Sequence, residues 1–120
     1  MTAAEGRYRP GELKVVIHGI YELQKGIRNL VLCTICRTSA RMVAEKLEKS
    51  GIGYLQQPVG TGRVNLYFGR RECLDAIRAF VDKPLNLLSP EEDFMLGAML
   101  DYDIPMQCQR YCQRRPTANQ

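Results

Sequence analysis

The sequence predicts a small α+β domain with a four-stranded sheet, helices on one face, and the element order ββαββαα. Two pairs of β-rich runs are each separated by a short turn that contains glycine, at 24–26 and 60–62. Segments with helical spacing of apolar residues follow each pair. Because 120 residues suffice for one hydrophobic core, we expect a single domain at 13–115 between flexible segments at 1–12 and 116–120.

The strands are predicted as two β-hairpins. Leu13–Leu23 and Ile27–Cys33 would form the first, and Ile52–Val59 and Val64–Phe68 the second. Pro58 cannot donate to a strand ladder, so its strand should lie at an edge or end its pairing early.

Two amphipathic helices are expected after the hairpins. The first would be capped by Thr38 or Ser39 and end at Gly51, with apolar residues at helical spacing between them. The second would run from Cys73 to Val81 and stop before Lys83 and Pro84.

A third helix has a strong start signal, in which Ser89 is followed by a proline and three carboxylates. It should run to about Leu100 and is apolar nearly all round, so both of its sides must be covered. Either it is a core helix between the sheet and the last helix, or Met95 and Met99 dock onto a second copy of the chain or another partner. A fourth helix is expected at Met106–Arg115.

Composition points to a soluble cytoplasmic protein. The longest apolar run, 27–35, is interrupted by Arg28 and Asn29 and is far shorter than the roughly 20 residues of a membrane-spanning helix. Residues 1–10 are polar and lack a signal peptide's apolar stretch. In a reducing compartment the five cysteines should be thiols.

Charge is unevenly distributed along the chain. Residues 1–88 hold 14 basic and 8 acidic side chains, whereas 89–103 hold five acids and no base. This balance favours an acidic protein partner over nucleic acid, because the acidic helix would repel phosphate. Five arginines could form the basic face: Arg70, Arg71, Arg110, Arg114 and Arg115.

Four cysteines are candidates for redox or metal chemistry. Cys33 and Cys36 stand where a strand precedes a helix, as in thioredoxin-like proteins. Cys108 and Cys112 share a helix face and could complete a zinc site with them. The simpler interpretation is that the thiols are small buried side chains, and Cys33 in particular should be more than half buried and unbridged.

Recognisable catalytic motifs are lacking. His18 is the single histidine, and strand alternation would place it on one face with Glu22. The sequence has no glycine-rich phosphate loop, serine elbow or histidine pair for a metal. We therefore expect a non-enzymatic protein without a cofactor.

Several segments carry a family resemblance. They are His18–Glu22, Lys25–Leu32, Asp82–Leu85, Pro90–Phe94, Met99–Asp103 and Gln107–Tyr111. In these the chain resembles a small bacterial family designated DUF2023, a domain of unknown function. The resemblance implies a compact α+β protein whose gene often lies beside a flavodoxin gene, and it supplies no catalytic residues. The Cys33–Cys36 stretch departs from the family pattern.

Together these observations favour an accessory or interaction module, with flavodoxin or another electron-transfer protein as its partner. Flavodoxins as a class are acidic and this body is basic, so complementary charge would raise the rate of association. The alternative is a thiol redox or metal-binding protein that uses Cys33 and Cys36, with Cys108 and Cys112.

Overall fold

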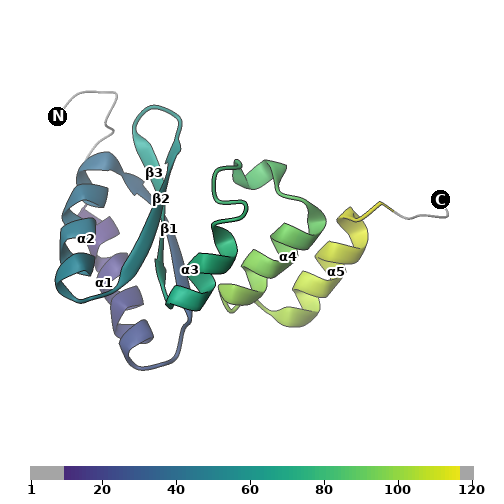
Figure 1. Cartoon of the computed structure of the whole chain (residues 1–120), viewed down its shortest axis with the longest axis horizontal. Helices are drawn as coiled ribbons and strands as arrows, with labels where there is room; N and C mark the ends of the chain where they lie inside the picture. The colour runs from purple at the N-terminus through teal and green to yellow at the C-terminus, as the bar shows by residue number, and fades with distance from the viewer. Residues whose placement is uncertain (1–9, 117–120) are drawn as a thin grey trace.

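The computed structural model describes residues 10–116, which form a three-stranded antiparallel sheet, five α-helices and one short 3-10 helix (Figure 1). The strands are β1 (Leu30–Cys36), β2 (Gly53–Val59) and β3 (Arg63–Gly69), in the order β1-β3-β2. The predicted four-stranded sheet is therefore wrong, and the predicted order ββαββαα becomes αβαββααα.

The missing strand is a helix. Leu13–Leu23, predicted to be the first strand, lies in α1 (Pro10–Gln24). Its β-branched residues suggested a strand, yet Val16 and Ile20 are buried against the sheet at helical spacing. Burial along one helical stripe outweighs a weak β propensity. The first hairpin is lost with it, and the predicted strand Ile27–Cys33 becomes β1, three residues further along.

Gly19 allows α1 to lie directly on the sheet. A Cβ added there would stand 3.1 Å from Val31 Cγ1 and 3.2 Å from Phe68 Cζ. These distances are tighter than ordinary packing contacts, so a side chain at this position would push α1 away from β1 and β3.

Helices cover both faces of the sheet, where one covered face was predicted. In Figure 1, α1 and α2 (Arg37–Lys49) lie on one side of the sheet, and α3 (Arg71–Ile77) and α4 (Pro90–Met99) lie on the other. Strand alternation supplies both cores, because Cys33 points into the first and Leu30 into the second. Gathered in the second core are Leu30, Tyr67, Leu74, Ile77, Phe80, Leu88, Leu96 and Leu100.

The other local predictions agree better with the structure. β2 and β3 form the expected hairpin, and β2 with its Pro58 is an edge strand. The first predicted helix is α2, although Cys36 caps it in place of Thr38 or Ser39. The second is shorter than predicted, since α3 ends at Ile77 and the linker to α4 contains only the 3-10 helix η2 (Leu85–Leu87).

The two last helices occupy one end of an elongated molecule, 52 × 35 × 23 Å. α4 begins at Pro90 as predicted, and α5 (Ile104–Arg114) follows a short turn (Figure 1). Of the segments expected to be flexible, residues 1–9 and 117–120 lie outside the described residues, and residues 10–12 begin α1.

Candidate functional site

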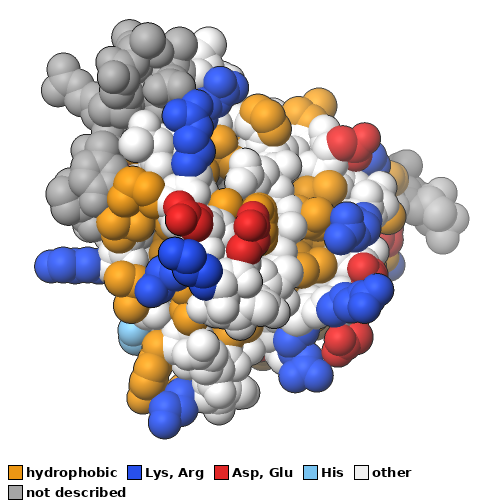
Figure 2. Space-filling view, turned by 60° about the vertical axis from the view of Figure 1, so that its left-hand side comes forward, with side chains coloured by type: hydrophobic (Ala, Val, Ile, Leu, Met, Phe, Trp, Pro, Cys, Tyr) orange, Lys and Arg blue, Asp and Glu red, His pale blue; other side chains and the backbone are white. Residues whose placement is uncertain are grey.

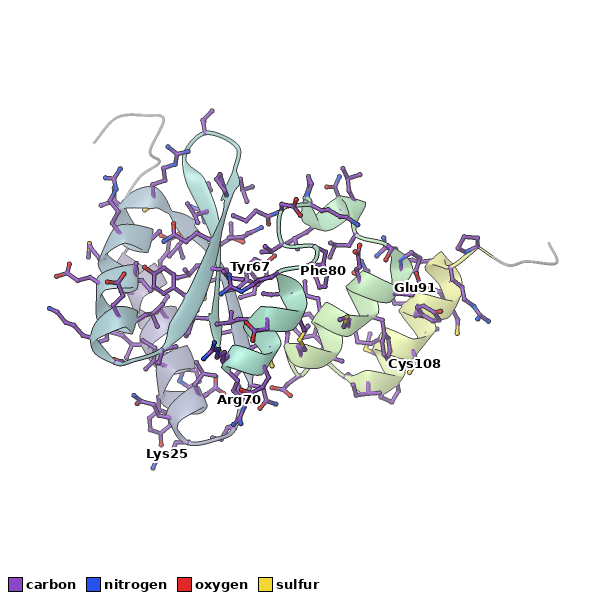
Figure 3. The ribbon with its side chains drawn as sticks, in the orientation of Figure 1. Lys25, Tyr67, Arg70, Phe80, Glu91 and Cys108 are labelled. Carbon is purple, nitrogen blue, oxygen red and sulfur yellow. The ribbon has the colours of Figure 1, made fainter. Side chains whose placement is uncertain are left out.

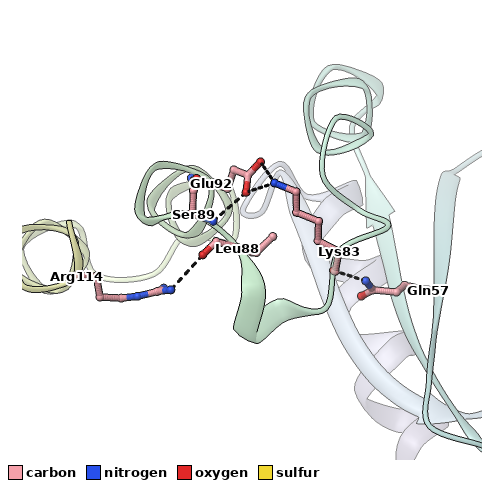
Figure 4. Close-up of polar contacts among 6 residues, drawn as sticks. All are labelled: Gln57, Lys83, Leu88, Ser89, Glu92 and Arg114. Atoms are coloured by element: carbon pink, nitrogen blue, oxygen red, sulfur yellow. Dashed lines mark hydrogen bonds and ion pairs between the residues drawn. The ribbon is translucent and has the colours of Figure 1, made fainter. Parts of the chain in front are cut away.

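A capping box fixes the start of α4 (Figure 4). Ser89 Oγ accepts a hydrogen bond from the Glu92 backbone at 3.1 Å, and Glu92 Oε1 accepts one from the Ser89 backbone at 2.9 Å. Lys83 Nζ, in the α3–α4 linker, lies 2.9 Å from the same carboxylate. These bonds from Ser89 and Lys83 hold the pKa of Glu92 below its usual range.

Asp93 attaches α5 to α4. Arg110 approaches this carboxylate through two nitrogens, at 2.7 and 3.2 Å, and Arg114 lies 3.1 Å from it. Arg114 also donates to the Leu88 carbonyl at 3.1 Å (Figure 4). Partial burial alone would raise the pKa of Asp93, but the hydrogen bonds and charges of the two arginines outweigh it and lower that pKa.

An open groove of about 610 Å³ runs between the outward sides of α4 and α5. The groove is lined by Glu91, Phe94, Met95, Ala98, Met99, Cys108, Tyr111 and Cys112. Phe94 and Tyr111 meet edge to face across it, with ring centroids 5.9 Å apart. Met95 is 41% exposed, so this side of the helix is not a closed core.

The groove unites two sets of residues that the sequence kept apart. Met95 and Met99 were candidates for docking, and Cys108 and Cys112 for thiol or metal chemistry, yet all four line it. The opposite side of α4 packs Leu96 and Leu100 into the second core. This explains why the helix is apolar nearly all round.

The five candidate arginines do not form one face. Arg70 and Arg71 lie at the start of α3, where each pairs with a nearby carboxylate. Figure 3 places Arg70 by the sheet and Cys108 on α5, beyond α4. Arg110 and Arg114 are occupied by Asp93, and Arg115 lies over the Tyr111 ring, 5.7 Å from its centroid. On the face drawn in Figure 2, basic and acidic side chains are interspersed.

Cys33 and Cys36 belong to the fold's interior. Cys33 is 7% exposed, which confirms its predicted burial, and that burial raises the pKa of its thiol to about 11. Such a thiol remains protonated at neutral pH and is a poor nucleophile. Cys36 Sγ accepts from the Ser39 backbone at 3.4 Å and thereby caps α2, a structural role.

His18 is close to Glu22, as predicted, but for a different reason. The two residues are one helical turn apart in α1, with Nε2 3.6 Å from Oε1. The His18 side chain is 71% exposed, and Glu22 also pairs with Arg28 at 3.4 Å. This arrangement is an ordinary surface network.

A row of polar side chains crosses all three strands and was missed by the sequence analysis. Thr34 and Gln57 stand opposite Asn65 in the strand register. Thr34 Oγ1 donates to Asn65 Oδ1 at 2.6 Å, Asn65 Nδ2 donates to Gln57 Oε1 at 3.0 Å, and Gln57 Nε2 donates to the Lys83 carbonyl. The available signal was an asparagine in the middle of a strand, where it is disfavoured.

Neither a membrane span nor a cluster of metal ligands emerges within residues 10–116. No helix there has the length and apolar character to cross a bilayer. Nor do three or more histidine, cysteine or acidic side chains of that range gather as metal ligands would. Cys33 and Cys36 are thus not brought together with Cys108 and Cys112 into one site.

Comparison with known proteins gives a family and no activity. No curated protein matches the chain in sequence. The family described as "Protein of unknown function (DUF2023)" matches residues 14–114, from α1 to the end of α5. Because this match spans both cores and the groove, it confirms the resemblance drawn from the sequence, and the chain belongs to the DUF2023 family.

Proposed function

We propose that the protein is an interaction module that binds an acidic protein partner through the groove between α4 and α5. The observation that carries the proposal is the lining of that groove. Among residues 10–116, eight line the groove: seven are apolar, aromatic or sulfur-containing, and Glu91 is the charged one. An apolar surface left open on a small domain is typical of a protein-binding site.

The side chains in the groove suit a protein surface well. Methionine side chains are flexible and polarizable, so Met95 and Met99 can adapt to the shape of a partner. Phe94 and Tyr111 supply rigid aromatic area of the kind enriched at binding hot spots. An apolar helix or loop of the partner would cover these four residues.

Charge in the body of the protein supports an acidic partner. Residues 1–88 hold 14 basic and 8 acidic side chains, and Arg115 lies beside the groove over Tyr111, although the charged residue in the groove lining, Glu91, is itself acidic. Arg70 and Arg71, separated from the groove by α4, would act on long-range encounter more than on the bound state. A flavodoxin is the acidic partner that the family resemblance indicates.

The experiment compares two methionines of equal exposure. Met95 in the groove is 41% exposed and Met42 on α2 is 42% exposed. We expect Met95→Glu to weaken binding to the flavodoxin of the same organism at least tenfold, about 1.4 kcal/mol, in a calorimetric titration. Met42→Glu, which adds the same charge outside the groove, should bind like the wild type.

A second measurement separates long-range electrostatic attraction, which affects the association rate, from contacts made in the bound complex. Arg70→Glu with Arg71→Glu should slow association several-fold at about 0.05 M salt and have little effect at about 0.5 M, where charges are screened. Absence of binding at low salt would refute the flavodoxin assignment. Equal losses in the Met95 and Met42 variants would refute the groove as the docking site.

A further inference from the structure

A second hollow lies between the free end of the β2–β3 hairpin and the linker from α3 to α4. Figure 1 shows both segments along the upper side of the view, between α2 and α5. The cleft has a volume of about 880 Å³, which is within the range of small-molecule sites, about 300–1,000 Å³. It is separate from the groove between α4 and α5, and the proposed function does not use it.

The walls of the cleft are apolar. The hairpin contributes Pro58 and Val59, and the linker contributes Val81, Pro84 and Leu85. Proline rings present flat apolar surfaces, on which a planar ligand can lie.

The polar row Thr34–Asn65–Gln57 also lines the cleft. Asn65 and Gln57 are 4% and 7% exposed, and they are held in place by the hydrogen bonds along the row. Each side-chain amide has two N–H donors and an oxygen with two lone pairs. The row uses one N–H donor and one oxygen lone pair of Asn65, and likewise one donor and one lone pair of Gln57. Each amide therefore keeps one donor and one lone pair that the row does not use and that a ligand could engage.

No charged side chain takes part in this row. Of the residues that line the cleft, Asp82 is the ionisable one, and it is exposed. The neighbouring Lys83 is engaged with Glu92, 2.9 Å from its carboxylate. Fixed amide groups between apolar walls, without a counter-charge, select neutral ligands over ions.

From this geometry we propose that the cleft binds an uncharged planar heterocycle that has an amide or imide edge. Its adjacent N–H and C=O groups would pair with the free lone pairs and donors of Asn65 and Gln57. Its ring faces would contact the apolar walls. Side-chain amides read such donor–acceptor edges in nucleobases by the same pairing.

The test uses xanthine as the probe and theophylline as its matched control, because theophylline carries methyl groups in place of the imide N–H and a neighbouring ring N–H. We expect xanthine to shift the side-chain NH₂ signals of Asn65 and Gln57 in two-dimensional NMR spectra of the whole chain. Theophylline should bind at least tenfold more weakly.

Two variants link binding to the row. Gln57→Met removes one amide. Thr34→Val removes the hydroxyl donor at an exposed position and retains a β-branched shape. Each variant should weaken xanthine binding at least fivefold. Thr61→Val, in the exposed hairpin turn, should not. No shift of these two NH₂ signals, equal affinity for the two probes, or unchanged binding in the folded Thr34→Val variant would overturn the proposal.

Discussion

Asp93→Asn tests how the outer wall of the groove is attached. α5 has no buried residue. It is held by the Phe94–Tyr111 ring contact, by the bonds from Arg110 and Arg114 to Asp93, by the Arg114 bond to the Leu88 carbonyl, and by Gln107, which packs on Gly97. Replacing the carboxylate by an amide keeps the shape of the side chain and removes the charge that both arginines share.

The expected loss in the free energy that holds α5 in place follows from how far these three side chains are shielded from solvent. Asp93 is 18% exposed, Arg114 30% and Arg110 54%. Shielded hydrogen bonds to charged groups contribute about 1.5–3 kcal/mol, and exposed ion pairs about 0.2–1 kcal/mol. For this mixed case we expect a loss of about 1–2 kcal/mol, which raises the detached population of α5 roughly 5- to 30-fold.

Hydrogen exchange measures this population helix by helix. In Asp93→Asn, amides of α5 should exchange roughly 5- to 30-fold faster, while those of β3 should be unchanged. The control is Asp103→Asn at the start of α5, where the side chain makes no capping bond and asparagine caps as well as aspartate. Unchanged exchange in α5, or equal acceleration in both variants, would refute the role of Asp93.

The Asp93 carboxylate should make the attachment of α5 dependent on pH. The pKa of Asp93 is lower in the folded protein than its ordinary value, so its contribution is complete above about pH 5 and is lost as pH falls through the folded-state pKa. Protection factors of α5, which correct for the intrinsic pH dependence of exchange, should therefore decrease below about pH 4. In Asp93→Asn this decrease should be smaller.

Two further predictions concern the body of the protein. Gly69→Ala should lower the free energy of unfolding by about 1–3 kcal/mol, measured in a urea titration. The reason is that φ at Gly69 is +152° and an added Cβ would collide with the backbone of Asn29, just before β1. The control is Gly11→Ala, where an added Cβ meets nothing within 4 Å and the free energy of unfolding should not fall. Iodoacetamide should alkylate the exposed Cys108 and Cys112 in the native protein and spare Cys33, which is buried and has a pKa of about 11. Mass spectrometry of peptides would show which cysteines are labelled. Labelling of Cys33 in the native protein at the same rate as Cys108 and Cys112 would contradict its burial.

Elements with strong local signals were predictable from the sequence. The turn at 60–62 and the alternation of Val64, Leu66 and Phe68 specified the second hairpin. Ser89 and Pro90 specified the start of α4. α1 failed because its segment satisfies two patterns at once. Exposed Val15 and Ile17 add β-branched residues on its outer side, and local sequence alone could not show which stripe meets the sheet.

The candidate sites, like the fold, were predictable from the sequence only in part. That α4 is apolar nearly all round was visible in the sequence, but the pattern left open whether it is a core helix or a docking helix. In the structure Met99 packs against the second core as well as lining the groove, whereas Met95 is exposed. That Cys108 and Cys112 complete the groove depends on how α5 folds back, which no local pattern specifies. Asn65 was overlooked because the prediction placed helices on only one face of the sheet. The opposite face, which carries Asn65, was therefore expected to face solvent.

The attachment of α5 also bears on how the groove could accept a partner. One wall, α4, is fixed by Leu96 and Leu100 in the second core. The other wall, α5, has no fully buried residue and is held by ion pairs to Asp93, a hydrogen bond to the Leu88 carbonyl and one ring contact; ion pairs of this partly exposed kind exchange with water at little cost. Because α5 contributes no residue to either core cluster, an outward movement that widens the groove would break these surface contacts and remove no core residue. Flexible methionine side chains on the fixed wall can follow such a change, so the groove has both a stable base and an adjustable rim.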